Sequence, residues 1–396
     1  MSTTKTKTTA KTVGEKLKAY KDFFSDINSL FFEREFEVNQ IMYALMIREH
    51  VLLKGIPGAA KSEISRRVFG GMVGSRTYKA QFTRFMDEAY VFGPQLMDEF
   101  KKGIIRHNTK DSIVDADFAF LDELLNASEE LISALNEVLN ERTFTRQGQH
   151  EKSPLVTAIV TTNQDRESEK ELRAFYDRMM FKSDVQELTD QANRVKMYES
   201  TLSGKFHTQP EFDYDYLKDI HALIDSGKIT FDSAMLNFYD MLITEYVSQS
   251  GVFISPRKKN KMLKIPIAAA ALRGVTSVDV ECIHEIRYAL VEGGNAKQMT
   301  YFDGVFSKAK QAFGTFDVVV KINKLFGETK QGKFDKGEKV KRYMGIKKKV
   351  EKLLGEVQGT PSAAALIKSL SDIQERAQKE LDSIGELSDD DIFGGK

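Results

Sequence analysis

The chain has 396 residues, of which 41% are hydrophobic, and this length predicts two or three domains rather than one core. Its 58 Lys and Arg residues balance 58 Asp and Glu residues, which argues against a general nucleic-acid coat or a uniformly basic membrane surface. The single cysteine cannot form an internal disulfide, no signal-peptide pattern is visible, and no apolar run approaches the roughly 18 to 20 residues of a membrane span. We therefore expect a cytoplasmic protein without a membrane span.

Two helices are predicted ahead of the first strand. Residues 1–12 form a Lys- and Thr-rich leader with little apolar surface to bury, so we expect this leader to be disordered. Apolar residues then recur at helical spacing over 13–28 and 31–48, which indicates two helices that face a core.

A short apolar run at 51–53 leads into the most informative motif of the chain. Glycines allow such a strand-to-helix turn to wrap an anionic phosphate with successive N–H groups, and the helix start adds a positive dipole. Lys61 would reach the β- and γ-phosphates, and the Ser62 hydroxyl would bind Mg²⁺. Ala60 stands where a second glycine is usual, and we expect a negative φ there, which alanine tolerates. The predicted phosphate loop comprises Gly55, Ile56, Pro57, Gly58, Ala59, Ala60, Lys61 and Ser62.

Two adjacent carboxylates follow the second predicted strand, which spans 118–121. Ligands gather at the carboxyl ends of strands in an open α/β sheet, so Asp122 would hold Mg²⁺, largely through water, and Glu123 would polarise the attacking water. A solvated cap of the strand is the alternative, which the phosphate loop disfavours. A third strand at 155–160, with helical stretches between the strands, predicts a parallel sheet covered on both faces.

Two further residues are candidates for action on the γ-phosphate. Asn163 ends the run Thr161-Thr162-Asn163 and can orient the attacking water, or can merely start a turn. Arg178 follows a short helical stretch just before the sheet resumes, and across a subunit boundary it could act as an arginine finger. A surface ion pair with Asp177 is the alternative for that arginine.

After residue 185 the pattern becomes almost wholly helical, with predicted helices at 188–201, 216–224 and 233–248. Ser255 and Pro256 are typical of a helix start, so Arg257 would point toward whatever lies at that helix N-terminus and could reach the nucleotide. A solvated basic face is the alternative, because several lysines follow. Pro266 should kink or end this helix.

Two amphipathic helices are predicted near the end of the chain, over 340–357 and 363–384. The second carries its apolar residues close to a heptad seam. Packing within the chain is the simpler interpretation of both stripes, and a coiled coil with a partner is the alternative. An acidic tail at 386–396, with aspartates at 389–391, is expected to be mobile.

In this order, the elements resemble those of the MoxR group of AAA+ ATPases, and within it the RavA-like branch. The resemblance covers roughly residues 31 to 275. The motifs that carry it are Glu33-Arg34-Glu35, GIPGAAKS at 55–62, QFTRF at 81–85, VFGP at 91–94, FLDELLNAS at 120–128, LNERTF at 139–144, AFYDRM at 174–179 and SPR at 255–257.

The resemblance implies a homohexameric ring, ATP and Mg²⁺ as ligands, and nucleotide bound between neighbouring subunits. Members of the group resemble chaperones that remodel or activate protein complexes. The segment 93–116 would correspond to a hairpin inserted in the second helix of the core, where its basic residues could contact an acidic client or only solvent.

Two departures from the family pattern limit what the resemblance implies about partners. The region after residue 314 is much shorter than the long RavA tail, so a RavA-type partner is not carried over. The chain shows no von Willebrand factor A metal motif, so a partner of that kind would be a separate protein.

We expect an α/β fold in which a P-loop AAA+ core with a parallel sheet spans 13–186. An all-α lid would follow at 187–313 and a short helical C-terminal region at 314–385. The leading hypothesis is a ring-forming ATPase that converts ATP hydrolysis into remodelling of a protein partner.

A nucleotide-dependent motor acting on nucleic acid, of the restriction type, is the first alternative function. Basic segments around 257–264 and 339–349 support it, but apolar positions interrupt them and aromatic stacking platforms are lacking. A scaffold that uses ATP only to assemble is the second alternative, and the presence of Glu123 and Arg178 argues against it.

Overall fold

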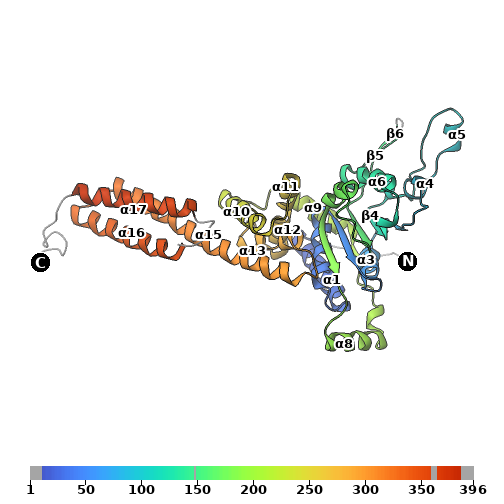
Figure 1. The fold of residues 1–396 in the computed structure, drawn as a ribbon, viewed down its shortest axis with the longest axis horizontal. Coiled ribbons are helices and arrows are strands. Elements are labelled where there is room, and N and C mark those ends of the chain that lie inside the picture. Colours follow the sequence, from blue (N-terminus) through green and yellow to red (C-terminus); the bar gives the residue numbers. More distant parts are fainter. Residues whose placement is uncertain (1–10, 147–148, 358–363, 385–396) are drawn as a thin grey trace, which may run out of the picture. The chain divides into compact units, whose positions relative to one another are not determined.

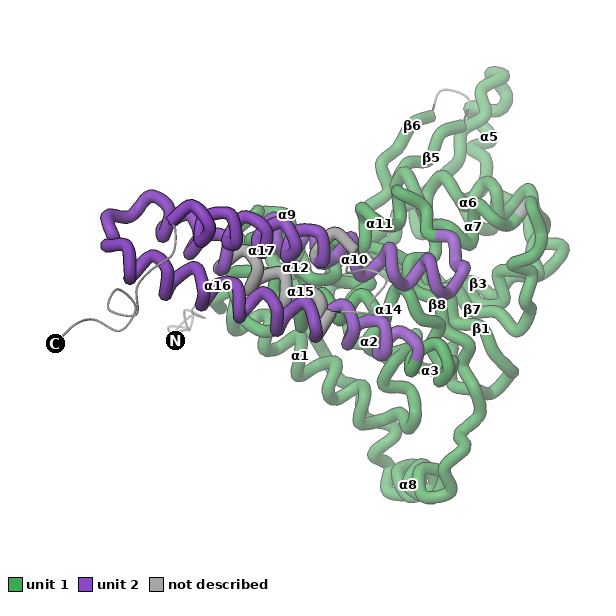
Figure 2. Tube along the Cα trace, turned by 60° about the vertical axis from the view of Figure 1, so that its left-hand side comes forward, with its two compact units in different colours: residues 1–232, 254–300 green, residues 233–253, 301–396 purple. Residues whose placement is uncertain are grey.

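The structure, a computed structural model, describes residues 11–146, 149–357 and 364–384 (Figure 1). The predicted acidic tail and nearly all of the predicted leader lie outside these residues. Contacts divide the chain into two compact units, one of residues 1–232 and 254–300 and the other of residues 233–253 and 301–396 (Figure 2). All predicted site residues belong to the first unit.

A five-stranded parallel sheet lies at the centre of the first unit, with strand order β3-β4-β7-β1-β8. Its strands are β1 (His50–Gly55), β3 (Thr77–Gln81), β4 (Phe118–Asp122), β7 (Thr157–Thr162) and β8 (Met179–Val185). The three strands that the apolar runs predict are present, the third beginning at Thr157 rather than at residue 155. The hydrophobic pattern of the sequence does not predict β3, because the side chains of this strand are half-buried or exposed and form no apolar run.

Helices cover both faces of this sheet. α2 (Glu35–Ile47) packs on β1, β7 and β8, and α3 (Lys61–Gly70) packs on β4 and β7. Leu52, Leu121 and Val160 of the strands belong to a buried cluster that also contains side chains of α6 (Glu129–Glu141) and α7 (Arg173–Arg178). Successive side chains of a strand point to opposite faces of the sheet. Helices therefore cover both faces of the sheet at β1. The predicted α/β class is confirmed.

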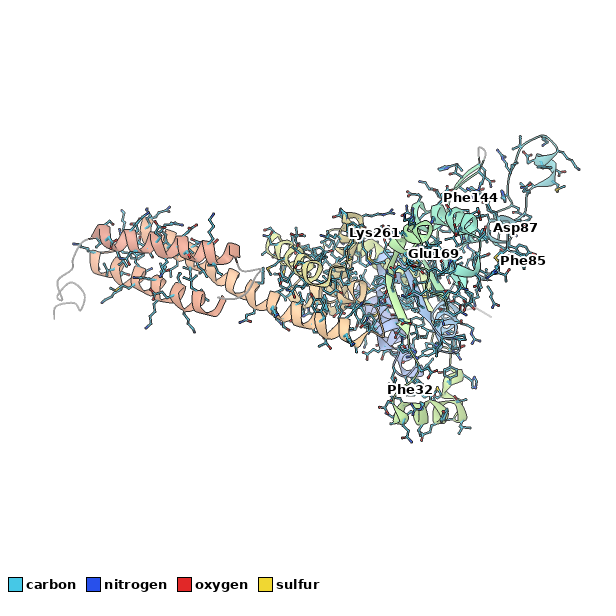
Figure 3. All side chains as sticks on the ribbon, viewed as in Figure 1. Phe32, Phe85, Asp87, Phe144, Glu169 and Lys261 are labelled. Atoms are coloured by element: carbon cyan, nitrogen blue, oxygen red, sulfur yellow. The ribbon has the colours of Figure 1, made fainter. Side chains whose placement is uncertain are left out.

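Two projecting segments of the first unit are joined to each other. β5 (Thr143–Arg146) and β6 (Gln149–Lys152) form an antiparallel hairpin, and the segment 93–116 folds back through an antiparallel bridge between Gln95 and His107. The backbone N–H of His107 donates to Gln149 Oε1 at 2.9 Å, and Gln149 Nε2 donates to the His107 carbonyl at 3.0 Å. Phe144 of β5 is buried, whereas Phe85 is 95% exposed; both side chains are labelled in Figure 3.

The remaining elements of the first unit are mostly helical. The helix that begins at Pro256 ends at Met262, as the prediction for Pro266 requires, because a proline at 266 has no N–H to donate to the Met262 carbonyl. The next helix begins at Lys264, so Pro266 falls in its first turn, where a missing N–H costs little. The α-helices and strands are α1 (Val13–Leu30), β2 (Met72–Val73), α4 (Glu88–Phe92), α5 (Met97–Phe100), α8 (Gln191–Leu202), β9 (Phe212–Asp213), α9 (Tyr214–Asp225), α11 (Pro256–Met262), α12 (Lys264–Arg273), α13 (Val280–His284) and α14 (Arg287–Leu290). The 3₁₀ turns are η1 (Ile113–Asp115), η2 (Leu124–Asn126), η3 (Lys170–Leu172) and η4 (Lys205–His207).

The second unit contains α10 (Ser233–Ser250), most of α15 (Ala296–Gln331), α16 (Lys336–Val357) and α17 (Ala364–Ile384). The apolar stripes of α16 and α17 pack against each other and against Ile322 and Phe326 of α15, so these stripes serve packing within the chain. The predicted boundary at 313/314 falls inside α15, and the predicted lid is shared between the units, so those domain boundaries stay a prediction. Within the described ranges, none of the helices combines the length and apolar character that crossing a membrane requires.

Candidate nucleotide site

The phosphate loop connects β1 to α3, as the sequence predicts, and three of its residues have positive φ. Gly55 has φ 138°, and a Cβ at this position would lie 2.3 Å from the Val185 carbonyl oxygen, so β8 leaves room only for glycine. Gly58 has φ 83°. The expectation of a negative φ at Ala60 is wrong: Ala60 has φ 67° and ψ 9°, because the chain makes its last left-handed turn immediately before α3 begins. An alanine in this region is strained by roughly 1 to 2 kcal/mol.

Lys61 lies over the loop that precedes it. Its Nζ donates to the carbonyl oxygen of Ile56 at 2.9 Å and also to that of Gly55. Burial lowers the pKa of Lys61, and the nearby carboxylates of Glu123 and Asp122 oppose that shift. The lysine is therefore placed between the loop and the two carboxylates that the sequence singled out.

The carboxyl ends of β4 and β7 bring the predicted metal and water residues together. Asp122 Oδ1 accepts a hydrogen bond from Ser62 Oγ at 3.4 Å and another from the Thr161 hydroxyl. Glu123 has φ 54°, its N–H donates to Thr161 Oγ1 at 3.4 Å, and its Oε2 accepts from the backbone N–H of Asn163 at 3.2 Å. Asn163 thus contacts the Glu123 side chain through the backbone N–H of Asn163.

Among the residues that the structure describes, no three His, Cys, Asp or Glu side chains are grouped so that they could hold a metal ion. Mg²⁺ has different requirements, because it retains several waters and usually takes one or two protein oxygens besides the phosphates of its nucleotide. The adjacent oxygens of Ser62 and Asp122 fit that donor set.

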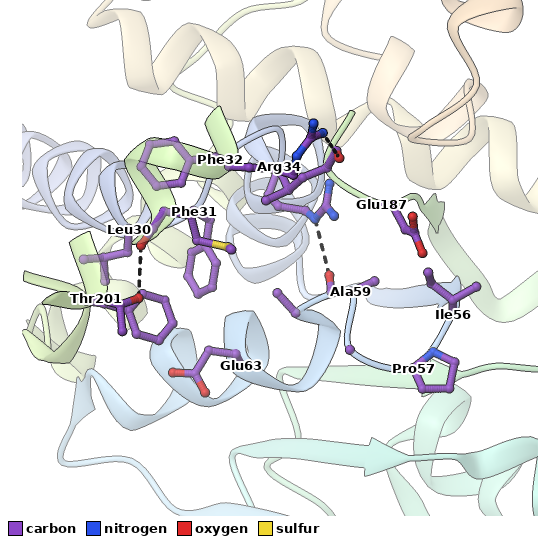
Figure 4. A pocket seen from close by; sticks show the side chains of 16 residues that line it. Leu30, Phe31, Phe32, Arg34, Ile56, Pro57, Ala59, Glu63, Glu187 and Thr201 are labelled. Atoms are coloured by element: carbon purple, nitrogen blue, oxygen red, sulfur yellow. Dashed lines mark hydrogen bonds between the residues drawn. The ribbon is translucent and has the colours of Figure 1, made fainter. Parts of the chain in front are cut away.

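The phosphate loop also forms part of the wall of a cavity of about 630 Å³ (Figure 4). This volume is within the range of roughly 300 to 1,000 Å³ that small-molecule sites occupy. Arg34 lines this cavity and donates from Nε to the Ala59 carbonyl at 3.3 Å. Its walls come from the end of α1 and the turn before α2, the phosphate loop with the start of α3, and the segment from 187 to 206 that contains α8 and η4: Leu30, Phe31, Phe32, Arg34, Ile56, Pro57, Gly58, Ala59, Ala60, Glu63, Glu187, Leu188, Arg194, Met197, Thr201 and Phe206.

The two predicted arginines lie together at the opposite end of the sheet. Because β1 and β8 are parallel, with His50 opposite Met179 and Gly55 opposite Val185, Arg178 lies at their amino ends. Six strand residues of roughly 3.3 Å each separate that end from the phosphate loop. The Ser255 hydroxyl, two residues before Arg257, donates to the side chain of Asp177, next to Arg178, and after burial the charge of Arg257 contributes to lowering the pKa of Arg178.

Local contacts explain the pairing of these arginines. Ser255 caps α11 by accepting from the Lys258 N–H at 3.2 Å, and its Oγ donates to Asp177 Oδ1 at 3.0 Å. Arg178 Nη1 donates to the Ala174 carbonyl, while its buried Nε has no hydrogen-bond partner among the described residues. The structure therefore brings Arg257 to Arg178 and not to the phosphate loop of its own chain.

Sequence reasoning missed three residues that the structure places at the site. Thr161 contacts both carboxylate residues, and Arg34 and Glu33 tie the turn before α2 to the walls of the cavity. Thr161 stood in the run that ends at Asn163, and Glu33 and Arg34 stood in a motif of the resemblance, but no local pattern showed what they contact.

Sequence comparisons identify a family profile and several proteins that resemble this chain. Residues 18–213 match the profile of the bpMoxR family, described as the MoxR domain in the MoxR-vWA-beta-propeller ternary systems. Two uncharacterized proteins of Methanocaldococcus jannaschii are each 28% identical, over 265 and 267 residues; each alignment covers 66% of this chain, and 67% and 69% of those proteins. Chaperone MoxR1 of Mycobacterium tuberculosis is 29% identical over 151 residues, 37% of this chain and 39% of that protein.

The fold also occurs among solved structures. The crystal structure of a proposed ATPase from Cytophaga hutchinsonii matches with a TM-score of 0.57 at 17% identity, covering 76% of this chain and 95% of that chain. Residues 18–213 are thus similar to MoxR domains, and the solved structure shows that the fold of this chain also occurs in another protein.

Proposed function

We propose that this protein binds ATP with Mg²⁺, hydrolyses it in a ring of identical subunits, and uses the cycle to remodel or activate a protein partner. The observation that carries the proposal is a set of linked hydrogen bonds beside the phosphate loop, at the carboxyl ends of the strands. Asp122 accepts from both Ser62 and Thr161, and Thr161 accepts from the N–H of Glu123. The comparisons favour this function over a nucleic-acid motor, since the matched family is the MoxR family.

Each residue of this arrangement has a role in the proposed reaction. The loop from Gly55 to Ala60 binds the phosphates through backbone N–H groups, and Lys61 neutralises their charge. Ser62 and Asp122 would hold Mg²⁺, which neutralises charge that develops on the phosphates. Glu123 accepts a proton from the attacking water, and Asn163 orients that water.

Arg178 and Arg257 act on the nucleotide of a neighbouring subunit in this proposal. Both lie at the amino end of the sheet, away from the phosphate loop of their own chain. Two adjacent guanidinium groups repel each other, and an anion placed between them removes that repulsion. The γ-phosphate of a neighbour is such an anion, and a closed ring, which we expect to be hexameric, supplies it to every subunit.

The partner in this proposal is a separate von Willebrand factor A protein in the cytoplasm, because the matched family occurs in MoxR-vWA-beta-propeller systems. The RavA-like branch stays part of the proposal. Exposed apolar side chains on the segment that contains α4 and α5 offer a surface to that partner or its client: Phe85, Tyr90, Leu96, Met97, Phe100 and Ile104.

The variant Glu123→Gln tests this function directly. The amide cannot accept the proton of the attacking water, so we expect phosphate release to fall by roughly 10² to 10⁴ while ATP binding is retained. Phosphate release and binding of a fluorescent ATP analogue are measured on the same preparations. Wild-type protein that binds no adenine nucleotide with magnesium, or a variant with unchanged turnover, would refute the proposed role of Glu123.

A further inference from the structure

Glu33 connects the turn before α2 to the start of α8, more than 150 residues later in the chain. Its Oε2 accepts from the Thr189 N–H at 3.0 Å and from the Thr189 hydroxyl at 3.3 Å. Its Oε1 accepts from the Asp190 N–H at 3.0 Å and from Asn193 Nδ2 at 3.0 Å. These hydrogen bonds, that of Asn193 first, lower the pKa of Glu33 to about 2.

The backbone at Glu33 is unusual as well. Its φ is 54°, in the left-handed region that a residue with a Cβ enters at a cost, so the surrounding contacts must stabilise this conformation. The next residue, Arg34, donates to the Ala59 carbonyl of the phosphate loop and to the Gln186 carbonyl before α8. Residues 33 and 34 are thus bonded to two walls of the cavity.

α8 has little apolar packing to hold it in place. Ser200 is the one residue of this fully described helix that is buried. Along the outer side, Val195, Tyr198 and Leu202 are 46%, 56% and 88% exposed, respectively. Other side chains of α8 nevertheless line the nucleotide cavity: Arg194, Met197 and Thr201. The position of this cavity wall therefore depends on polar contacts at its ends.

Different residues anchor the two ends of the α8 segment. Arg67 of α3 donates to the carbonyls of Phe206 at 2.8 Å and Thr208 at 3.1 Å, after the helix. Glu33 is the corresponding anchor at the helix start.

We propose that the cavity wall formed by Arg194, Met197 and Thr201 of α8 is the base end of the site, and that Glu33 is a positioning residue that holds this wall in place. Glu33 would thereby set affinity for the base of the nucleotide, without a part in phosphate chemistry. This inference rests on the proposed ATP-binding function. It separates the site into a phosphate end, organised by the loop, and a base end, organised by the contact of Glu33 with α8.

The variants Glu33→Gln and Asn193→Ala test the inference on the full chain, because each weakens the same contact from a different side. We expect the dissociation constant of a fluorescent ATP analogue to rise by roughly five- to tenfold as hydrogen bonds to a carboxylate are lost. The kcat at saturating ATP should stay within about twofold of wild type, and inorganic tripolyphosphate should bind unchanged. Amide hydrogen exchange of 191–202 should accelerate in both variants without nucleotide.

Glu35→Gln is the matched control, since Glu35 is exposed, lies two residues away and takes no part in the four hydrogen bonds to α8. An unchanged exchange rate of α8 in both test variants would overturn the inference, and so would equal losses of ATP and tripolyphosphate binding. A wild-type protein that binds no ATP would instead refute the proposed function, and the exchange rates would still decide whether Glu33 holds α8.

Discussion

At the scale of single residues, the site depends on a few side chains whose neighbours fix their geometry. Thr161 shows this most clearly, because one buried hydroxyl donates to Asp122 and accepts from the N–H of Glu123. The two carboxylates are consecutive in the chain but serve different roles in the proposed reaction. A single hydroxyl between them keeps the metal ligand and the water-activating residue in a fixed relation.

Thr161→Val keeps the shape of this side chain and removes its hydroxyl. We expect a fall in kcat of roughly tenfold and a higher Mg²⁺ requirement, because Asp122 loses a hydrogen bond that a charged group accepts. Titration of ATPase activity with Mg²⁺ measures both effects, and Thr161→Ser should restore them. Thr157→Val is the control, since Thr157 is buried on the same strand and donates instead to the Ala44 carbonyl, at 3.2 Å. Equal defects in the two valine variants would reduce Thr161 to a structural residue.

The left-handed conformation of Ala60 leads to a prediction about stability. Glycine adopts φ 67° without the steric cost of a Cβ, and this gain exceeds the extra entropy that glycine loses on folding. Ala60→Gly should therefore increase the free energy of unfolding by roughly 0.5 to 1 kcal/mol, measured by denaturant unfolding. Ala59→Gly should lower it, because Ala59 is buried and has no positive φ. A lower stability of Ala60→Gly would mean that the loop changes conformation in solution.

At the scale of elements, local patterns predicted those parts of the fold whose signal lies within a few residues. The apolar runs of β1, β4 and β7 and the glycines of the phosphate loop are local features, and the structure contains each of them. The half-exposed β3 has no such signal, and neither does the contact of Glu33 with α8, which joins residues far apart in the chain. The φ of Ala60 follows from the geometry of the turn before α3, which the conformational preference of alanine alone does not predict.

The position of α8 should depend on pH in a predictable direction. The pKa of Glu33 is about 2 in the folded protein, below its ordinary value of 4.5, so the ionised carboxylate stabilises docked α8 fully above about pH 5. This contribution is lost as the pH falls through about 2. Hydrogen exchange of 191–202, corrected for its intrinsic pH dependence, should show progressive loss of protection between these values. Glu33→Gln should show no such titration, and a wild-type profile equally flat over this range would contradict the prediction.

At the scale of the whole molecule, the residues of the proposed reaction lie at two opposite ends of the sheet, so each site would take residues from two subunits. The phosphate loop, Asp122 and Glu123 lie at the carboxyl ends of the strands, whereas Arg178 lies at the amino ends with Arg257 beside it. Arg178 therefore lies away from the phosphate loop of its own chain, and in the proposed reaction a neighbouring subunit would have to supply it. The separation therefore predicts that ATPase activity depends on assembly and rises with protein concentration.

Mixing two inactive variants tests this division of roles. Arg178→Ala keeps its own phosphate loop but offers no arginine to a neighbour, while Lys61→Ala offers the arginine but lacks the lysine that binds phosphate. Equal mixing in a closed ring leaves roughly a quarter of the sites with both groups, so activity should recover to about that fraction of wild type. Lys61→Ala mixed with Glu123→Gln is the control, because every site then lacks one of two groups supplied by the same chain. If the first mixture stays as inactive as the control after subunit exchange, Arg178 does not act on a neighbouring nucleotide.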